Sequence, residues 1–100
     1  MEQNSIAIAY LKEPREKIWG VVVKLDQTGL IIKGLDLNSF DDWCSQIARG
    51  EEQLIGLSII FFPTARIEKI VLDETTGSAP SLSDKFHSIV GMKVQDYLGL

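Results

Sequence analysis

The stretch Gly56-Leu-Ser-Ile-Ile-Phe-Phe-Pro-Thr-Ala-Arg-Ile-Glu-Lys-Ile-Val-Leu72 decides the fold that we predict for this chain of 100 residues. It contains an apolar run, Ile59 to Phe62, which a proline ends, and a second apolar segment from Ile70 to Leu72. A strand that is apolar at consecutive positions is typical of the centre of a sheet or of a face that a helix covers. We therefore predict a fourth strand at Leu57–Phe62 that is central or covered.

The corner after this strand, Pro63–Arg66, is too short for a crossover connection, which needs about a dozen residues. We therefore expect a fifth strand to pair directly with the fourth around a tight corner. Ile67 and Ile70 lie three residues apart rather than two, which indicates a turn of 3₁₀ helix before the last strand resumes.

Three earlier segments have the pattern of strands. In the first, large apolar residues alternate with alanine, and the second is rich in β-branched and aromatic residues. Gly20 indicates a bulge or bend inside the second strand, and Gly34 permits strong curvature in the third. A polar connection that ends in Gly29 joins them as a hairpin. The three predicted strands are Ser5–Leu11, Ile18–Leu25 and Leu30–Asp36.

Two segments change to the period of a helix. Apolar residues three and four apart predict a helix at Ser39–Arg49, with Ser39 or Asn38 as its cap and Gly50 as its stop. Residues 73–81 form a polar linker. After it, Ser81 and Asp84 resemble a capping box that opens a C-terminal helix from Leu82.

The stretch Phe61–Ile70 resembles the second signature of Sm-like barrels, in which an apolar strand ends in a tight corner and two apolar residues follow three apart. The hairpin Val21–Leu35 is similar in kind to the first signature. The resemblance covers roughly residues 16 to 72. It implies a mainly β fold with helices, namely a small, five-stranded, strongly bent antiparallel β-barrel. Residues 1–72 would form this barrel with the helix 39–49 inserted after its third strand, and residues 82–100 a C-terminal helical segment packed on the same domain.

The resemblance also implies ring formation, but it does not carry over an RNA site. RNA-binding members of the family have an Arg-Gly or Lys-His type of pair at the corner, where this chain has Pro63-Thr64. The Asp and Asn of the first signature are compressed here into Asp36-Leu37-Asn38, which runs directly into a predicted helix.

The charge balance gives no support for generic binding to nucleic acid or to anionic lipid. The chain has 14 acidic and 10 basic residues, with a net charge of −4. Counterion release needs clustered Lys and Arg, which this sequence lacks. No apolar run approaches the length of a membrane helix, and no secretory signal is visible. With a single cysteine that cannot form an internal disulfide, these features predict a cytoplasmic protein.

Few residues are candidates for chemistry, and we predict no enzyme, catalytic residue, metal site or cofactor. Cys44 is the only thiol and is expected to be a small buried core residue, while His87 is expected at the surface. The acidic residues Asp36, Asp41 and Asp42 are explained by helix capping, with a divalent cation as the alternative. An enzyme that uses Cys44 or this acidic group is the remaining competing class.

We predict a non-catalytic interaction module that self-associates through the edges of its barrel. Such pairing removes the hazard of open edges, and it leaves the partner as a second copy of the chain. The residues expected at this contact are Ile60, Phe62, Ile70 and Leu72. The alternative is an Sm-like nucleic-acid-binding protein with an altered site, for which the candidate contacts are Lys33, Arg66 and Lys69.

Overall fold

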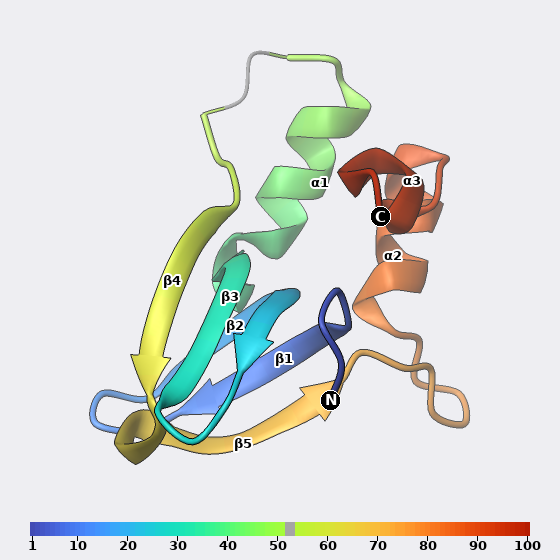
Figure 1. Ribbon diagram of the computed structural model, residues 1–100. Helices are drawn as coiled ribbons and strands as arrows, with labels where there is room; N and C mark the ends of the chain where they lie inside the picture. The colour runs from blue at the N-terminus through green and yellow to red at the C-terminus, as the bar shows by residue number, and fades with distance from the viewer. Residues whose placement is uncertain (52–53) are drawn as a thin grey trace.

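The computed structural model describes residues 1–51 and 54–100, in which five antiparallel strands form one sheet with helices packed at one end (Figure 1). The strand order is β4-β3-β2-β1-β5. The strands are β1 Ile6–Leu11, β2 Glu16–Leu25, β3 Gly29–Asp36, β4 Ser58–Pro63 and β5 Ile67–Leu72. The helices are α1 Phe40–Ala48, α2 Leu82–Val90 and α3 Val94–Leu98, with 3₁₀ turns η1 Leu37–Ser39 and η2 Thr64–Arg66.

The predicted five strands, the inserted helix and the C-terminal helix are therefore confirmed, but the sheet is not closed into a barrel. Along the described residues β5 pairs with β1 and β4 pairs with β3, so β4 and β5 lie at opposite edges. Our prediction that the fifth strand pairs with the fourth was wrong. So was the prediction of a central fourth strand, because β4 is an edge strand.

The corner η2 explains how a short connection reaches the other edge of the sheet. The Thr64 N–H donates to the Thr28 carbonyl (3.1 Å), in the β2–β3 turn, and the Lys12 N–H donates to the Arg66 carbonyl (2.9 Å). The corner thus lies across the end of a coiled sheet, where both edges come near the same two turns. From there β4 and β5 diverge (Figure 1).

The bend of the sheet is concentrated where Gly20 of β2 faces Gly34 of β3. A Cβ atom on Gly20 would lie 2.3 Å from the Lys33 carbonyl oxygen, and one on Gly34 would lie 2.3 Å from the Trp19 carbonyl oxygen. Only glycine permits so close an approach of two backbones. The irregularity in the β2–β3 register lies farther along, between Val22 and Lys24, so Gly20 marks a bend and not that bulge.

Side chains on the two faces of the sheet form two separate cores. The inner core consists of Ala7, Ala9, Leu11, Ile18, Val22, Leu30, Ile32 and Phe62. The helix-side core consists of Trp19, Leu35, Phe40, Trp43, Cys44, Phe86 and Val94. Trp19 packs the sheet against α1, since the centre of its ring lies 4.9 Å from that of the Phe40 ring and 5.5 Å from that of the Trp43 ring. Both faces of β1 contribute side chains to these cores, and its two alanines, Ala7 and Ala9, are fully buried.

Asp73, directly after β5, attaches the C-terminal helices to the sheet. Its carboxylate accepts the Trp19 indole N–H (3.1 Å) and the backbone N–H groups of Leu82 and Ser83 (2.8 Å each). The Ser83 hydroxyl donates to the same carboxylate (2.7 Å). The polar stretch 73–81 is therefore fixed at both of its ends.

The caps of the two longer helices differ in how well the sequence predicted them. Ser81 accepts the Asp84 N–H (3.0 Å), as the capping-box pattern predicted, and Gly91 ends α2 in a left-handed conformation. At α1, the predicted residue Ser39 occupies the N-cap position but makes no side-chain cap bond. Asp36, which was not predicted as a cap, accepts the Asn38 N–H (2.8 Å). The 3₁₀ turn η1 precedes α1, and Asp36 is the N-cap of that turn. Within the described residues, no helix is long and apolar enough to cross a membrane.

The close approach of β2 and β3 predicts that Gly20→Ala destabilises the fold. The added methyl group would overlap the Lys33 carbonyl, and overpacking of this kind costs about 1–3 kcal/mol. Gly56→Ala is the matched control, because a Cβ there meets no atom within 4 Å of the described structure. Urea unfolding of both variants measures the difference, and equal midpoints would contradict the account of the bend.

The role of Asp73 predicts that Asp73→Ala loosens α2 from the sheet. Three N–H groups and one hydroxyl would lose a charged acceptor, for an expected loss of about 3 kcal/mol in the free energy of unfolding. Glu74→Ala, at the exposed neighbouring position, should change stability by less than about 0.5 kcal/mol. Near-UV circular dichroism of Trp19 and Trp43 together with urea unfolding tests this, and comparable values for the two variants would refute it.

Candidate interaction site

The strands β4 and β5 are the two free edges of the sheet within the described part of the chain. An edge strand has a row of backbone N–H and C=O groups directed away from its neighbour, and these groups pair readily with another strand. Proteins usually protect such edges with charges, prolines, bulges or a covering element. The two edges of this sheet differ in how much of this protection they have.

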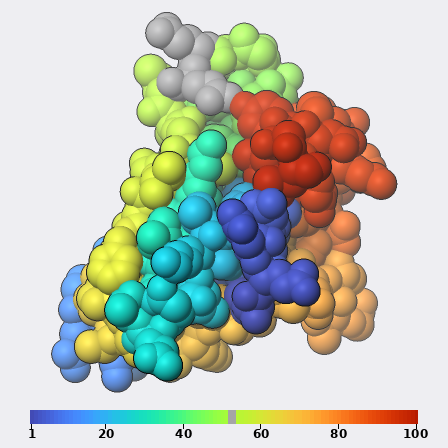
Figure 2. All heavy atoms as spheres, viewed as in Figure 1, coloured from blue at the N-terminus to red at the C-terminus, as the bar shows by residue number. Residues whose placement is uncertain are grey.

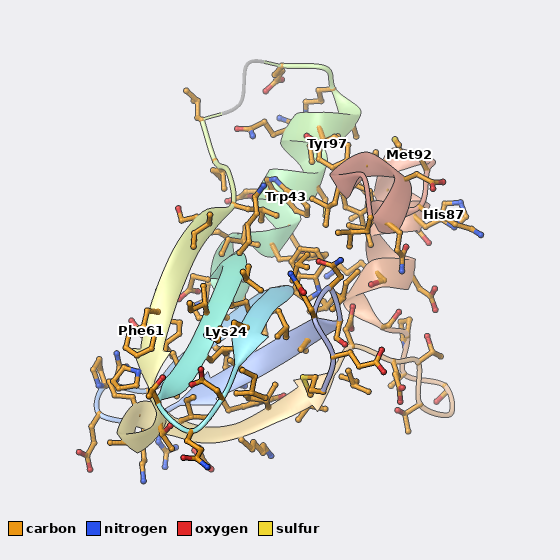
Figure 3. The ribbon with its side chains drawn as sticks, viewed as in Figure 1. Lys24, Trp43, Phe61, His87, Met92 and Tyr97 are labelled. Carbon is orange, nitrogen blue, oxygen red and sulfur yellow. The ribbon has the colours of Figure 1, made fainter. Side chains whose placement is uncertain are left out.

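β4 has almost none of it. Its sequence, Ser-Ile-Ile-Phe-Phe-Pro, has no charged residue, and Pro63 comes only at its end. Ile59 and Phe61 are 71% and 54% exposed, and they lie on the same face as the helix-side core but beyond the reach of the helices. Phe61 points away from the sheet in Figure 3, and β4 lies at the surface beside β3 in Figure 2. The edge is thus both open and apolar.

β5 is an edge of mixed character. Val71 and Leu72 are 42% and 43% exposed, whereas Glu68 and Lys69 provide charges near its start. A shift in the β1–β5 register between Tyr10 and Leu11 accounts for the spacing of three between the inward residues of β5. The apolar half of this edge is therefore its C-terminal half.

The four residues predicted at a self-association contact differ in which way they face and in how exposed they are. Ile60, Phe62 and Ile70 face the inner core, and Phe62 is buried there. Leu72 is exposed. The outward residues Ile59, Phe61 and Val71 were missed because a run that is apolar at every position does not reveal which face of the strand points inward.

The three basic residues predicted as nucleic-acid contacts do not form one group. Arg66 is used within the fold: its guanidinium donates to the carbonyls of Lys12 (3.1 Å) and Pro14 (2.8 Å) and forms an ion pair with Glu16 (3.2 Å). Lys33 is exposed on β3, and Lys69 is on β5. Strands β2 and β1 lie between them, so three strand spacings, about 14 Å, separate the two lysines.

The candidates for chemistry are also separate. Cys44 is fully buried in the helix-side core, as predicted, and His87 is exposed on α2 and points into solvent (Figure 3). Asp41 forms an ion pair with Lys85 (2.7 Å), and Asp36 caps η1. In residues 1–51 and 54–100, no three His, Cys, Asp or Glu side chains gather as they would around a metal ion.

Burial predicts that the Cys44 thiol is inert in the folded protein. Loss of solvation, with a smaller contribution from Asp41, raises the pKa of this thiol to about 11, so the nucleophilic thiolate is scarce at neutral pH. A thiol reagent at pH 7 should therefore label Cys44 slowly in buffer and rapidly in denaturant. Labelling at the same rate in both conditions would show that Cys44 is accessible in the folded protein and would contradict its assignment as an inert core residue.

Comparison with known proteins identifies no family for this chain. No family model matches the chain, and neither the curated proteins nor the solved structures contain a significant match to it. The open edges of β4 and β5 are therefore the feature of this chain on which a functional proposal has to rest.

Proposed function

We propose that this chain is a non-catalytic interaction module whose copies associate through their sheet edges, β4 of one copy against β5 of the next. The observation that carries the proposal is the open edge of β4, six residues without a charge, with Ile59 and Phe61 exposed beside it. An edge of this kind promotes aggregation unless another strand covers it. Ordered pairing with a second copy covers the β4 edge and produces an assembly of defined size instead of an aggregate.

A second copy is the favoured partner because each chain has two complementary edges. Pairing β4 with β4 around a two-fold axis would leave both β5 edges open. Pairing β4 with β5 uses both edges of every copy, and a closed ring then has no free edge. Val71 and Leu72 on β5 provide apolar surface for the exposed side chains of β4.

The finer description of the fold belongs to the same proposal. We interpret the sheet as an opened relative of an Sm-like barrel, in which association of copies takes the place of closure. The bent β2–β3 hairpin at Gly20 and Gly34 and the short corner η2 support this interpretation. The proposed setting is the cytoplasm, which suits a chain whose single cysteine forms no internal disulfide.

The nucleic-acid alternative has less support from the geometry. It needs Lys33, Arg66 and Lys69 to act together, but Arg66 is occupied by Glu16 and two carbonyl groups. We therefore retain self-association as the proposed function.

The proposal predicts that Phe61→Lys dissociates the assembly while the monomer stays folded. Phe61 is more than half exposed in one copy, so the fold tolerates lysine there, but a charge in the paired edge weakens association. Loss of one buried apolar side chain, about 2 kcal/mol, corresponds to roughly thirtyfold weaker association. Ile89→Lys, an exposed apolar residue on α2 away from both edges, is the matched control.

Sedimentation velocity of the native chain and both variants measures this effect. The native chain and Ile89→Lys should sediment as multiples of 11.2 kDa, and Phe61→Lys as a monomer. A native chain that stays monomeric at every concentration, or an assembly that Phe61→Lys leaves intact, would refute the proposal.

A further inference from the structure

A cleft at one end of the sheet has a composition that self-association does not explain. It has a volume of about 440 Å³ and lies where the end of β1, the β1–β2 turn, the start of β5 and the end of β3 meet. Its lining includes Tyr10, three basic residues and three acidic ones. The charged residues are Arg15, Lys17, Lys69, Glu16, Asp36 and Glu68.

Two lysines lie against the same aromatic ring. Lys17 of β2 and Lys69 of β5 are the direct cross-strand neighbours of Tyr10 on its two sides. Their ammonium nitrogens are 5.5 Å and 4.7 Å from the centre of the Tyr10 ring. Cation–π attraction holds each ammonium near the ring, so the two nitrogens lie no more than about 10 Å apart.

Within the described residues, none of the acidic residues of the cleft forms an ion pair with these cations. Glu16 is paired with Arg66 (3.2 Å), and Asp36 accepts the Asn38 N–H (2.8 Å). In the described part of the chain, no carboxylate oxygen lies within 4.0 Å of the side-chain nitrogens of Lys17, Lys69 or Arg15. Three cations without an ion pair, Arg15, Lys17 and Lys69, thus line the cleft together with two carboxylates without one, Asp36 and Glu68.

We propose that this cleft binds a phosphate group of a ligand. A phosphate has several charged oxygens, so it can accept hydrogen bonds from the Lys17 and Lys69 ammonium groups and from the Arg15 guanidinium at once. The apolar ring of Tyr10 forms one wall of the cleft, which suits a phosphate attached to an organic group. Lys69, predicted from the sequence as a nucleic-acid contact, belongs to this cleft, whereas Lys33 and Arg66 are not among the residues that line it.

The proposal does not depend on self-association. Arg15 and Lys17 lie on the β1–β2 turn and on β2, away from both free edges, so substitutions there test the cleft without altering a strand edge. Lys33→Ala is the matched control, since Lys33 is also an exposed lysine of the same sheet but lies outside the cleft.

The experiment is a titration of the full chain, followed by amide NMR, with three probes: inorganic phosphate, adenosine monophosphate and a hexamer of uridylate. We expect saturable shifts confined to residues around Tyr10, Lys17 and Lys69. Arg15→Ala and Lys17→Ala should each weaken binding about tenfold, because each removes a charge-assisted hydrogen bond. Lys33→Ala should leave the affinity unchanged. Lys17→Gln keeps the length of the side chain and serves as a second variant if Lys17→Ala fails to fold.

The three probes also distinguish the source of the phosphate. Binding of the monophosphate as tight as that of the hexamer indicates a small free ligand, and much tighter binding of the hexamer indicates a nucleic-acid strand. Both outcomes support the cleft. Shifts that do not saturate with any probe, shifts spread over the whole surface, or an equal loss for Lys33→Ala and Lys17→Ala would overturn it.

Discussion

The close contact between the backbones of Gly20 and Gly34 is the constraint on which the rest of this structure depends. A side chain at either position would force β2 and β3 apart, because the nearest carbonyl oxygens lie 2.3 Å from the ideal Cβ positions. The contact lets the hairpin bend sharply, and the coiled sheet then brings its two edges near the same end. Only because of that coil can the short corner η2 lead from β4, at one edge, to β5, at the other.

The two faces of the sheet carry two separate cores, and the helix-side face of β4 is left partly bare. Trp19, Trp43 and Phe86 pack together where α1 and α2 cover the sheet, and Asp73 holds α2 in place through hydrogen bonds. The helices do not extend over the far part of β4. Phe61 therefore remains at the surface, although its neighbour Phe62 is buried in the inner core. The apolar edge follows from the limited length of the helical layer.

Local pattern in the sequence was sufficient to predict the elements, because strand and helix periods are local properties. The strands, the inserted helix, the cap of α2 by Ser81 and the burial of Cys44 were all predicted correctly. The hairpin of β2 and β3 was predicted correctly, but the pairing of β5 was not, because the choice between β4 and β1 as its neighbour depends on the coil of the whole sheet. The cap of η1 by Asp36 was missed for a local reason, since the 3₁₀ turn before the helix has no distinct pattern.

The candidate sites were less predictable than the fold. The inward face of β4 could not be assigned, because Ile59 to Phe62 are apolar at every position and either face fits the core. The cleft around Tyr10 joins residues that are far apart in the sequence, and the pairing of β1 with β5 brings Lys69 to it. For Arg66 the sequence predicted a ligand contact, whereas in the structure its guanidinium donates to carbonyl groups of the β1–β2 turn.

The most direct test of head-to-tail association is cross-linking between single cysteines on the two edges. Ile59→Cys and Val71→Cys, each with Cys44→Ala, would be treated with a short thiol cross-linker separately and as a mixture. The account predicts covalent dimers in the mixture and none with either variant alone, because β4 of one copy lies against β5 of another. Dimers formed by Ile59→Cys alone, or no dimers in the mixture, would contradict it.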